Sequence, residues 1–146
     1  MMEQLQAGDQ IVLYDRALTE RAYAGLEAGD AERCGCSYCR NFASQRSVIY
    51  PESFREILNQ LGIDADKEGE VYECGSDGSL WQYGGWFYLS GQLIQPGERM
   101  TDAGSGFQFY FADAKHLPKP AGDFGENVLA VEFSGAKVRW VIAERP

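Results

Sequence analysis

The sequence is short of several features that would assign a protein to a familiar class. It has a single histidine, and 22 Asp and Glu residues outnumber 13 Lys and Arg residues, which gives a formal net charge of -9. Binding to phosphate backbones needs a surplus of Lys and Arg, and anionic membrane surfaces attract the same residues. We therefore expect neither nucleic acid nor membrane as a partner, whereas a protein partner stays open.

Segments that would direct the chain into a membrane are also missing. No apolar run approaches the roughly 20 residues that span a bilayer. The opening stretch MMEQLQAGDQ lacks the basic and apolar regions of a secretory signal. A cytoplasmic location is therefore the expectation. In that reducing compartment, clustered cysteines are more often metal ligands or redox thiols than structural disulfides.

Motifs of common catalytic sites are absent from the sequence as well. It contains no GxxxxGK[ST] phosphate loop and no GxGxxG after a strand. Gly104-Ser105-Gly106 lacks the spacing of a GxSxG nucleophile elbow. Any histidine-based mechanism would have to use His116, which lies in the loop-like stretch KHLPKP. The sequence therefore assigns no reaction, and whether the protein is an enzyme stays open.

The residues that are present indicate an α+β domain. With 146 residues, 45% of them apolar, the chain fits a single domain spanning 1–146. Two consecutive helices are predicted, one over Ser37–Ile49 and one from Pro51 to Gly62. The buried face of the second helix would be formed by Phe54, Ile57, Leu58 and Leu61.

The second half of the chain is predicted to consist mainly of strands, because its apolar residues alternate with a period of two. Short turns rich in Gly, Asp and Ser favour hairpins and hence an antiparallel sheet. Together with a strand at Ile11–Leu18, this predicts a twisted, mainly antiparallel sheet of about six strands on which the two helices pack. Residues 19–33 fit either a strand or a loop. The later strands are expected at Glu70–Cys74, Leu80–Ser90 with a break at Gly84-Gly85, Phe107–Ala112, Asn127–Phe133 and Lys137–Ile142.

Three of the four cysteines lie in the stretch CGCSYCRNF, residues 34–42. Cys36 and Cys39 are three positions apart at a predicted helix start, so both sulfurs can reach one point. Gly35 gives the preceding cysteine the freedom to join them. Structural zinc takes four thiolates, or three thiolates and one imidazole. We therefore predict a structural zinc site formed by Cys34, Cys36, Cys39 and Cys74, with His116 as the alternative fourth ligand.

Other roles for the cysteines remain open. Cys36-Ser-Tyr-Cys39 has the CxxC spacing of disulfide oxidoreductases, although those proteins place it in a βαβ unit that is not predicted here. An iron–sulfur cluster would also need four thiolates. Reduced thiols packed near the core are a further interpretation, because cysteine behaves as a small hydrophobic residue.

The stretch LWQYGGWFYLSG, residues 80–91, gathers aromatic side chains around a glycine pair. A glycine pair inside a strand indicates a bulge or a close backbone approach. Indole and phenol rings suit a flat or apolar small ligand, but the same residues also favour strands and fill cores. The candidate pocket residues are Trp81, Tyr83, Trp86 and Tyr88.

The combination of CxCxxCRNF, YPESFREILNQLGID, VYECG and YGGWFYLSG resembles a family of small uncharacterised bacterial domains that share a cysteine cluster before two helices and a YGGW-type strand. The resemblance covers roughly residues 34 to 91. It implies a free-standing bacterial cytoplasmic domain and supplies no catalytic residue.

Three functional hypotheses follow. The leading one is a non-catalytic domain with a structural zinc site. The second is a protein-interaction or immunity-like module without metal. The third is a small-molecule binder or enzyme built on the Gly84-Gly85 strand.

Overall fold

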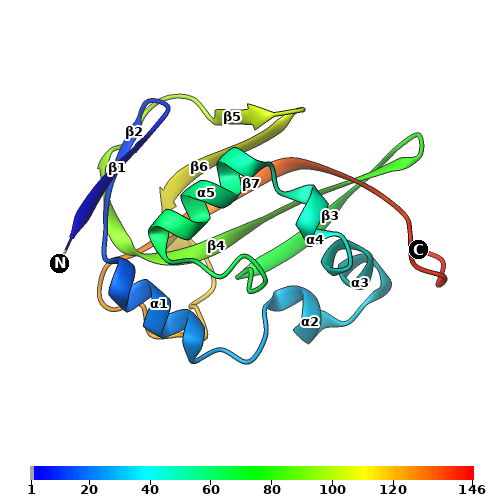
Figure 1. The fold of residues 1–146 in the computed structure, drawn as a ribbon, viewed down its shortest axis with the longest axis horizontal. Coiled ribbons are helices and arrows are strands. Elements are labelled where there is room, and N and C mark those ends of the chain that lie inside the picture. Colours follow the sequence, from blue (N-terminus) through cyan, green and yellow to red (C-terminus); the bar gives the residue numbers. More distant parts are fainter. Residues whose placement is uncertain (1) are drawn as a thin grey trace.

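A computed structural model describes residues 2–146, which form five α-helices and a seven-stranded sheet (Figure 1). All strand pairs are antiparallel. The predicted α+β class and mainly antiparallel sheet are confirmed, although the structure has more helices and strands than expected. The helices are α1 (Arg16–Ala24), α2 (Asp30–Cys34), α3 (Ser37–Ala43), α4 (Arg46–Ile49) and α5 (Glu52–Leu61), with a 3-10 turn η1 (Ala114–His116). The strands are β1 (Glu3–Ala7), β2 (Gln10–Tyr14), β3 (Glu70–Asp77), β4 (Leu80–Gln95), β5 (Thr101–Gly104), β6 (Phe107–Asp113) and β7 (Val128–Arg139).

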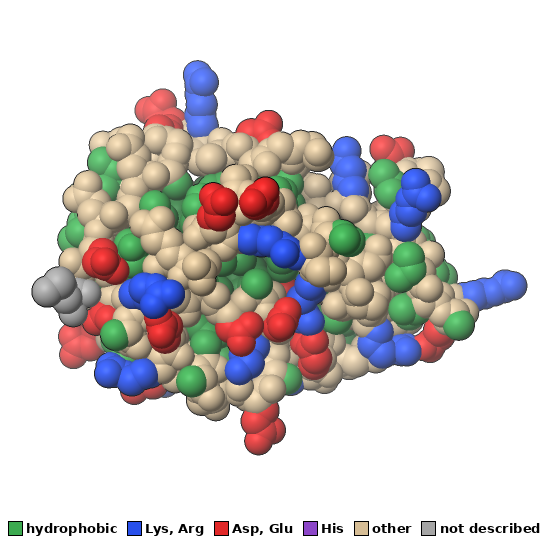
Figure 2. All heavy atoms as spheres, in the orientation of Figure 1, with side chains coloured by type: hydrophobic (Ala, Val, Ile, Leu, Met, Phe, Trp, Pro, Cys, Tyr) green, Lys and Arg blue, Asp and Glu red, His purple; other side chains and the backbone are tan. Residues whose placement is uncertain are grey.

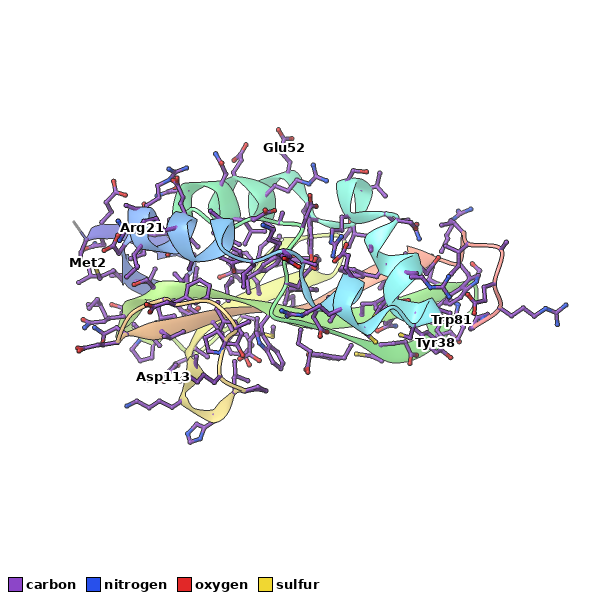
Figure 3. The ribbon with its side chains drawn as sticks, turned by 90° about the horizontal axis from the view of Figure 1, so that it is seen from below. Met2, Arg21, Tyr38, Glu52, Trp81 and Asp113 are labelled. Atoms are coloured by element: carbon purple, nitrogen blue, oxygen red, sulfur yellow. The ribbon has the colours of Figure 1, made fainter. Side chains whose placement is uncertain are left out.

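The strand order places β7, the last strand of the sequence, in the middle of the sheet. The order is β1-β2-β4-β7-β6-β5, and β3 pairs with β4 beside this path. Helices α3, α4 and α5 cover one face of the sheet (Figure 1). Glu52 of α5 and Asp113 at the end of β6 point to opposite sides of the sheet (Figure 3). The segment that follows β6 therefore begins on the face that these helices leave uncovered.

The main core lies between α5 and the sheet and consists largely of phenylalanine rings. The ring of Phe54 lies 4.9 Å from that of Phe107 and 5.1 Å from that of Phe109, measured between ring centroids. All three side chains are at most 2% exposed. Burial of one such ring contributes about 1.5–3 kcal/mol to folding. The helical pattern of α5 and the alternating pattern of β6 were thus correctly assigned to the core.

Residues 19–33, predicted as a strand or a loop, are mostly helical, and the predicted strand Ile11–Leu18 was too long. Its strand part, β2, ends at Tyr14. The carboxylate of Asp15 then accepts the backbone N–H of Leu18 at 3.0 Å and caps α1. An aspartate that satisfies a free N–H of the first turn is a common helix start. The polar interruption of the apolar run therefore marks the boundary between two elements.

Other predicted boundaries change where short helices or glycines occur. The predicted helix Ser37–Ile49 is two short helices, α3 and α4. The predicted strands Asn127–Phe133 and Lys137–Ile142 are one strand, β7, which continues through Gly135 with a φ of 76°. Likewise β4 runs unbroken through the Gly84-Gly85 pair, where its register with β7 shifts. The edge strands β1 and β5 were not predicted.

Helix α1 fills a gap along one edge of β4. That edge pairs with β3 and, further along, with β2. Between the two strands, the hydroxyl of Thr19 accepts the Ser90 N–H at 3.1 Å, and the hydroxyl of Tyr23 donates to the Tyr88 carbonyl at 2.6 Å. Buried backbone groups need such partners. Side chains of a helix thus replace strand pairing here and fix α1 against the sheet.

The surface of the helix-bearing face carries both charge signs. Figure 2 shows acidic and basic side chains interspersed across it, with apolar side chains scattered between them. Across residues 2–146, no helix combines the length and the apolar character required to traverse a bilayer.

Candidate metal site

The turn between α2 and α3 brings three sulfur atoms together. Helix α2 ends at Cys34, and Gly35 follows with a φ of 66°, a left-handed conformation that favours glycine. Cys36 is the N-cap of α3 and Cys39 lies in its first turn. The three sulfurs all lie within 4.8 Å of one another. The predicted convergence of these three cysteines is therefore present in the structure.

Helix α2 is held in place at its first residue. The backbone N–H of Asp30 donates to the Glu68 carbonyl at 3.0 Å, and its carboxylate accepts the Val71 N–H at 3.0 Å. Just before the helix, a Cβ on Gly29 would lie only 2.6 Å from the Cα of Lys67. A side chain there would push the two segments apart. The sequence thus seats α2 against the chain that leads into β3.

Helix α3 is anchored to the rest of the fold by hydrogen bonds at two of its residues. The Tyr83 hydroxyl of β4 donates to the Tyr38 carbonyl at 2.8 Å. The Asn41 side chain, fully buried, donates to the Arg139 carbonyl at 3.0 Å and accepts the Val141 N–H at 2.8 Å. These bonds tie α3 to the sheet and to the segment after β7. The two helices that carry the cysteines are therefore positioned independently of any metal.

An aromatic group lies beside the start of α3. The ring of Tyr38 contacts the rings of Trp81 and Trp140 with centroid distances of 5.5 and 5.6 Å. Tyr38 and Trp81 lie side by side at one end of the molecule (Figure 3). Edge-on contacts of this kind contribute about 0.5–1.5 kcal/mol beyond area burial. They fix Tyr38, which directly precedes Cys39, in the first turn of α3.

The three cysteines differ in exposure, and Cys36 and Cys39 also differ in acidity. Cys34 and Cys36 are exposed, whereas Cys39 is only 6% exposed. Burial would raise the pKa of Cys36, but the Cys39 N–H, which donates to its sulfur at 3.4 Å, and the neighbouring thiols lower that pKa overall. Burial raises the pKa of Cys39, and hydrogen bonds and charge from the other two sulfurs add to that rise. A bound cation would favour the thiolate form of all three.

The donor set fits a thiophilic metal ion. Two sulfurs bound to one tetrahedral zinc lie about 3.8 Å apart, given a Zn–S bond of about 2.3 Å. The sulfurs here, within 4.8 Å of one another, need to approach by no more than about 1 Å. Thiolates select zinc, copper(I) and iron–sulfur clusters over magnesium or calcium. Cys34, Cys36 and Cys39 could therefore hold a metal ion.

The two predicted candidates for the fourth ligand lie outside this group. Cys74 is an exposed residue of β3, and its sulfur is not among those within 4.8 Å of one another. His116 is exposed and ends η1, which directly follows Asp113 on the side of the sheet opposite Glu52 (Figure 3). The structure thus assembles three of the five candidate metal ligands.

The four aromatic residues of the Gly84-Gly85 strand do not share one pocket. Tyr83 lies on the helix-bearing face, where its ring is 5.1 Å from that of Phe42. Trp86 and Tyr88 point to the other face, as the alternation of a strand requires. There they help to line a cavity of about 280 Å³. Trp81 belongs to the aromatic group beside α3, so the predicted residues divide between two faces.

A buried ionic network near the site was missed by sequence reasoning. Arg46, only 8% exposed, donates to Glu32 at 2.5 and 2.7 Å and to Glu68 at 2.9 and 2.7 Å. The Tyr50 hydroxyl also donates to Glu68, at 2.6 Å. Charged residues are mostly exposed, and nothing in their spacing marks these as exceptions. The network joins α2, the carrier of Cys34, to α4 and to the segment before β3.

Comparisons of the chain with protein-family models, with curated proteins and with solved structures gave no match. The resemblance to small bacterial domains therefore stays a prediction.

Proposed function

We propose that the protein is a zinc-binding domain in which Cys34, Cys36 and Cys39 supply three thiolate ligands. The observation that carries this proposal is the mutual approach of three sulfurs to within 4.8 Å on helices that the rest of the fold already positions. Three thiolates would otherwise repel one another, and a divalent cation removes that repulsion. Zinc is the proposed ion because it combines thiolate preference with tetrahedral structural sites.

The proposed role of the metal is structural. The ligands come from the last residue of α2 and the first turn of α3, so one ion would join two short helices of five and seven residues. Isolated helices of that length are unstable in water. Zinc would add its binding free energy to the folded arrangement of this corner of the molecule. In this interpretation the metal stabilises the corner formed by α2 and α3 and performs no reaction.

The fourth coordination position distinguishes two forms of the site. Closed structural zinc sites have four protein ligands, whereas open sites keep a water molecule in one position. Cys74 is the predicted fourth ligand, and to serve as one it would have to join the three sulfurs from the exposed part of β3. Replacing it with serine separates the two forms, because only the closed form loses a ligand.

The test is elemental analysis of protein prepared under anaerobic, reducing conditions without a metal-affinity column. We expect about one zinc per chain, since one cluster can hold one ion. Cys34→Ser and Cys36→Ser, both at exposed positions, should lose most of the zinc while keeping the wild-type circular dichroism spectrum. Cys74→Ser is the matched control and should retain zinc if the site is open.

Hydrogen exchange then tests the structural role. Removing zinc with a chelator should increase amide exchange selectively in residues 30–43 and leave the strands β4 and β7 protected. Absence of zinc from the anaerobic protein, or full zinc content in Cys36→Ser, would overturn the proposal. Unchanged exchange after zinc removal would overturn the structural role alone.

A further inference from the structure

The three sulfurs are not equivalent with respect to disulfide formation. Cys36 and Cys39 lie three residues apart across the first turn of α3. Cys36 is the N-cap, in extended backbone with a φ of -72° and a ψ of 165°, so it is not held at the spacing of residues inside a helix. Its sulfur and that of Cys39 lie within 4.8 Å of each other, and rotation of the two side chains has to shorten that distance to the disulfide bond length of about 2.05 Å. The Cys39 N–H already donates to the Cys36 sulfur at 3.4 Å, so that sulfur lies over the turn that holds its partner.

Cys34 is separated from the other two cysteines by a turn. It belongs to α2, and the left-handed Gly35 with a φ of 66° separates it from α3. The Arg40 Nε donates to the Gly35 carbonyl at 3.0 Å and braces this turn. A bridge from Cys34 would have to join two helices across this braced turn, whereas a bridge between Cys36 and Cys39 lies within one turn.

We propose that Cys36 and Cys39 are a site of reversible oxidation, at which a hydroperoxide converts the two thiols to a disulfide and so releases the metal. The release of zinc rests on the proposed function, whereas the formation of the disulfide does not. Of this pair, Cys36 is the residue that the oxidant reaches first, because it is exposed whereas Cys39 is only 6% exposed.

The chemistry balances with a hydroperoxide as the oxidant. The Cys36 thiolate attacks the terminal peroxide oxygen, the O–O bond breaks, and the leaving alkoxide or hydroxide takes up a proton. The sulfur of Cys39, as its thiolate, then attacks the sulfenic sulfur of Cys36, the S–O bond breaks, and hydroxide leaves and is protonated to water. The peroxide is reduced by two electrons and the two thiols are oxidised by two. A small-molecule thiol restores both cysteines by exchange.

The consequence for the metal follows from the ligand count. A disulfide removes two of the three clustered thiolates, and the ligands that remain, Cys34 and in the closed form Cys74, are too few to hold zinc against solvent. Helix α3 would keep its anchors to β4 and to the segment after β7, because neither anchor involves a cysteine. Oxidation is therefore expected to empty the site while the sheet remains folded.

The experiment treats reduced protein, both zinc-loaded and metal-free, with hydrogen peroxide. Free thiols are counted with a chromogenic disulfide, and released zinc is followed with a colorimetric chelator. We expect the four thiols to fall to two, with zinc released in parallel and both changes reversed by dithiothreitol. Cys34→Ser and Cys74→Ser should still form the bridge. Cys39→Ser should instead give a sulfenic acid at Cys36 that dimedone traps.

Peptide mapping locates the bridge. Cleavage after Arg33 and Arg40 gives the peptide CGCSYCR, which contains the three clustered cysteines. A bridge between Cys36 and Cys39 leaves the Cys34–Gly35 bond free to fragment in the mass spectrometer but protects the bonds inside the ring. A bridge that includes Cys34 or Cys74, or four thiols remaining under peroxide, would overturn the inference. Because metal-free protein is also tested, that result stays distinct from a failure to bind zinc.

Discussion

Replacing Arg46 with Met would remove the guanidinium that faces the carboxylate of Glu68. The Glu68 side chain is 0% exposed, so water cannot take the place of the lost partner. After the replacement Glu68 retains only the hydrogen bond from the Tyr50 hydroxyl, at 2.6 Å, among the side-chain bonds that the structure gives it. Methionine fills most of the volume of the arginine stem, so the change tests the charge more than the packing.

The size of the effect follows from the burial of the two carboxylates. Removing one partner of a buried ion pair costs about 3–5 kcal/mol, because the remaining charge is left without compensation. Glu32, the second partner of Arg46, is 42% exposed and regains water. Its loss adds at most about 1 kcal/mol. We therefore expect the free energy of unfolding to fall by about 3–6 kcal/mol, a large part of the ~5–15 kcal/mol typical of a domain.

Urea unfolding at neutral pH, followed by circular dichroism, measures this difference. Arg16→Met is the matched control, because Arg16 pairs with Glu20 on the surface, where the two side chains are 44% and 48% exposed. That variant should lose less than about 1 kcal/mol. Adding Glu68→Gln to Arg46→Met should restore part of the stability, since it removes the buried charge. Equal losses in Arg46→Met and Arg16→Met would refute the reasoning.

Three further predictions concern pH and packing. A hydrogen bond from the Arg46 guanidinium holds the pKa of Glu32 below its usual range. The stability that the ionised Glu32 gives the fold is therefore complete above its unfolded-state pKa of about 4.3, and it is lost as the pH falls through the lower folded-state pKa. Urea unfolding at a series of pH values should show Glu32→Gln to be less stable than wild type by up to about 1 kcal/mol at neutral pH, with the two proteins equally stable in acid. A difference in unfolding free energy that does not change with pH would contradict this. In Gly85→Ala the new Cβ would lie 2.2 Å from a backbone oxygen of β3, so thermal melts should show a loss of more than about 2 kcal/mol. Its control Gly25→Ala, with a φ of -80° and no contact closer than 3.6 Å, should stay within about 1 kcal/mol of wild type, and equal melting of the two would argue against the strand contact. Burial raises the pKa of Tyr83 to about 12, so the difference in phenolate absorbance between wild type and Tyr83→Phe should titrate near that pH, and a step near pH 10 would contradict it.

The elements that could be predicted from sequence are those whose apolar residues repeat regularly. Phe54, Leu58 and Leu61 mark α5, and Phe107 and Phe109 mark the core face of β6, because burial of one face imposes its period on the sequence. The cysteine cluster was predictable for a similar reason. The three cysteines are close in the sequence, and a helix start and one glycine are enough to bring their sulfurs together.

The features that could not be predicted depend on contacts between distant segments. Helix α1 buries Thr19 and Tyr23 because their hydroxyl groups bond to the backbone of β4, and no local pattern reveals that partner. Arg46 and Glu68 look like surface residues until the fold brings them together. Cys74 was assigned to the metal site because a tetrahedral site needs a fourth ligand and a later strand could carry it back. The structure places it as an exposed residue of β3, outside the group of three sulfurs.

The central position of β7 has a consequence for how the molecule is made. Synthesis proceeds from the N-terminus, so β4 and β6 emerge while the strand that joins them, residues 128–139, does not yet exist. Each of them then exposes an open edge of unpaired backbone groups, which is a template for pairing with another chain. Pairing over such distances along the sequence is also slow. The nascent chain is therefore most prone to aggregation just before its final strand arrives, and a chaperone that shields β4 and β6 at that stage would raise the yield of folded protein.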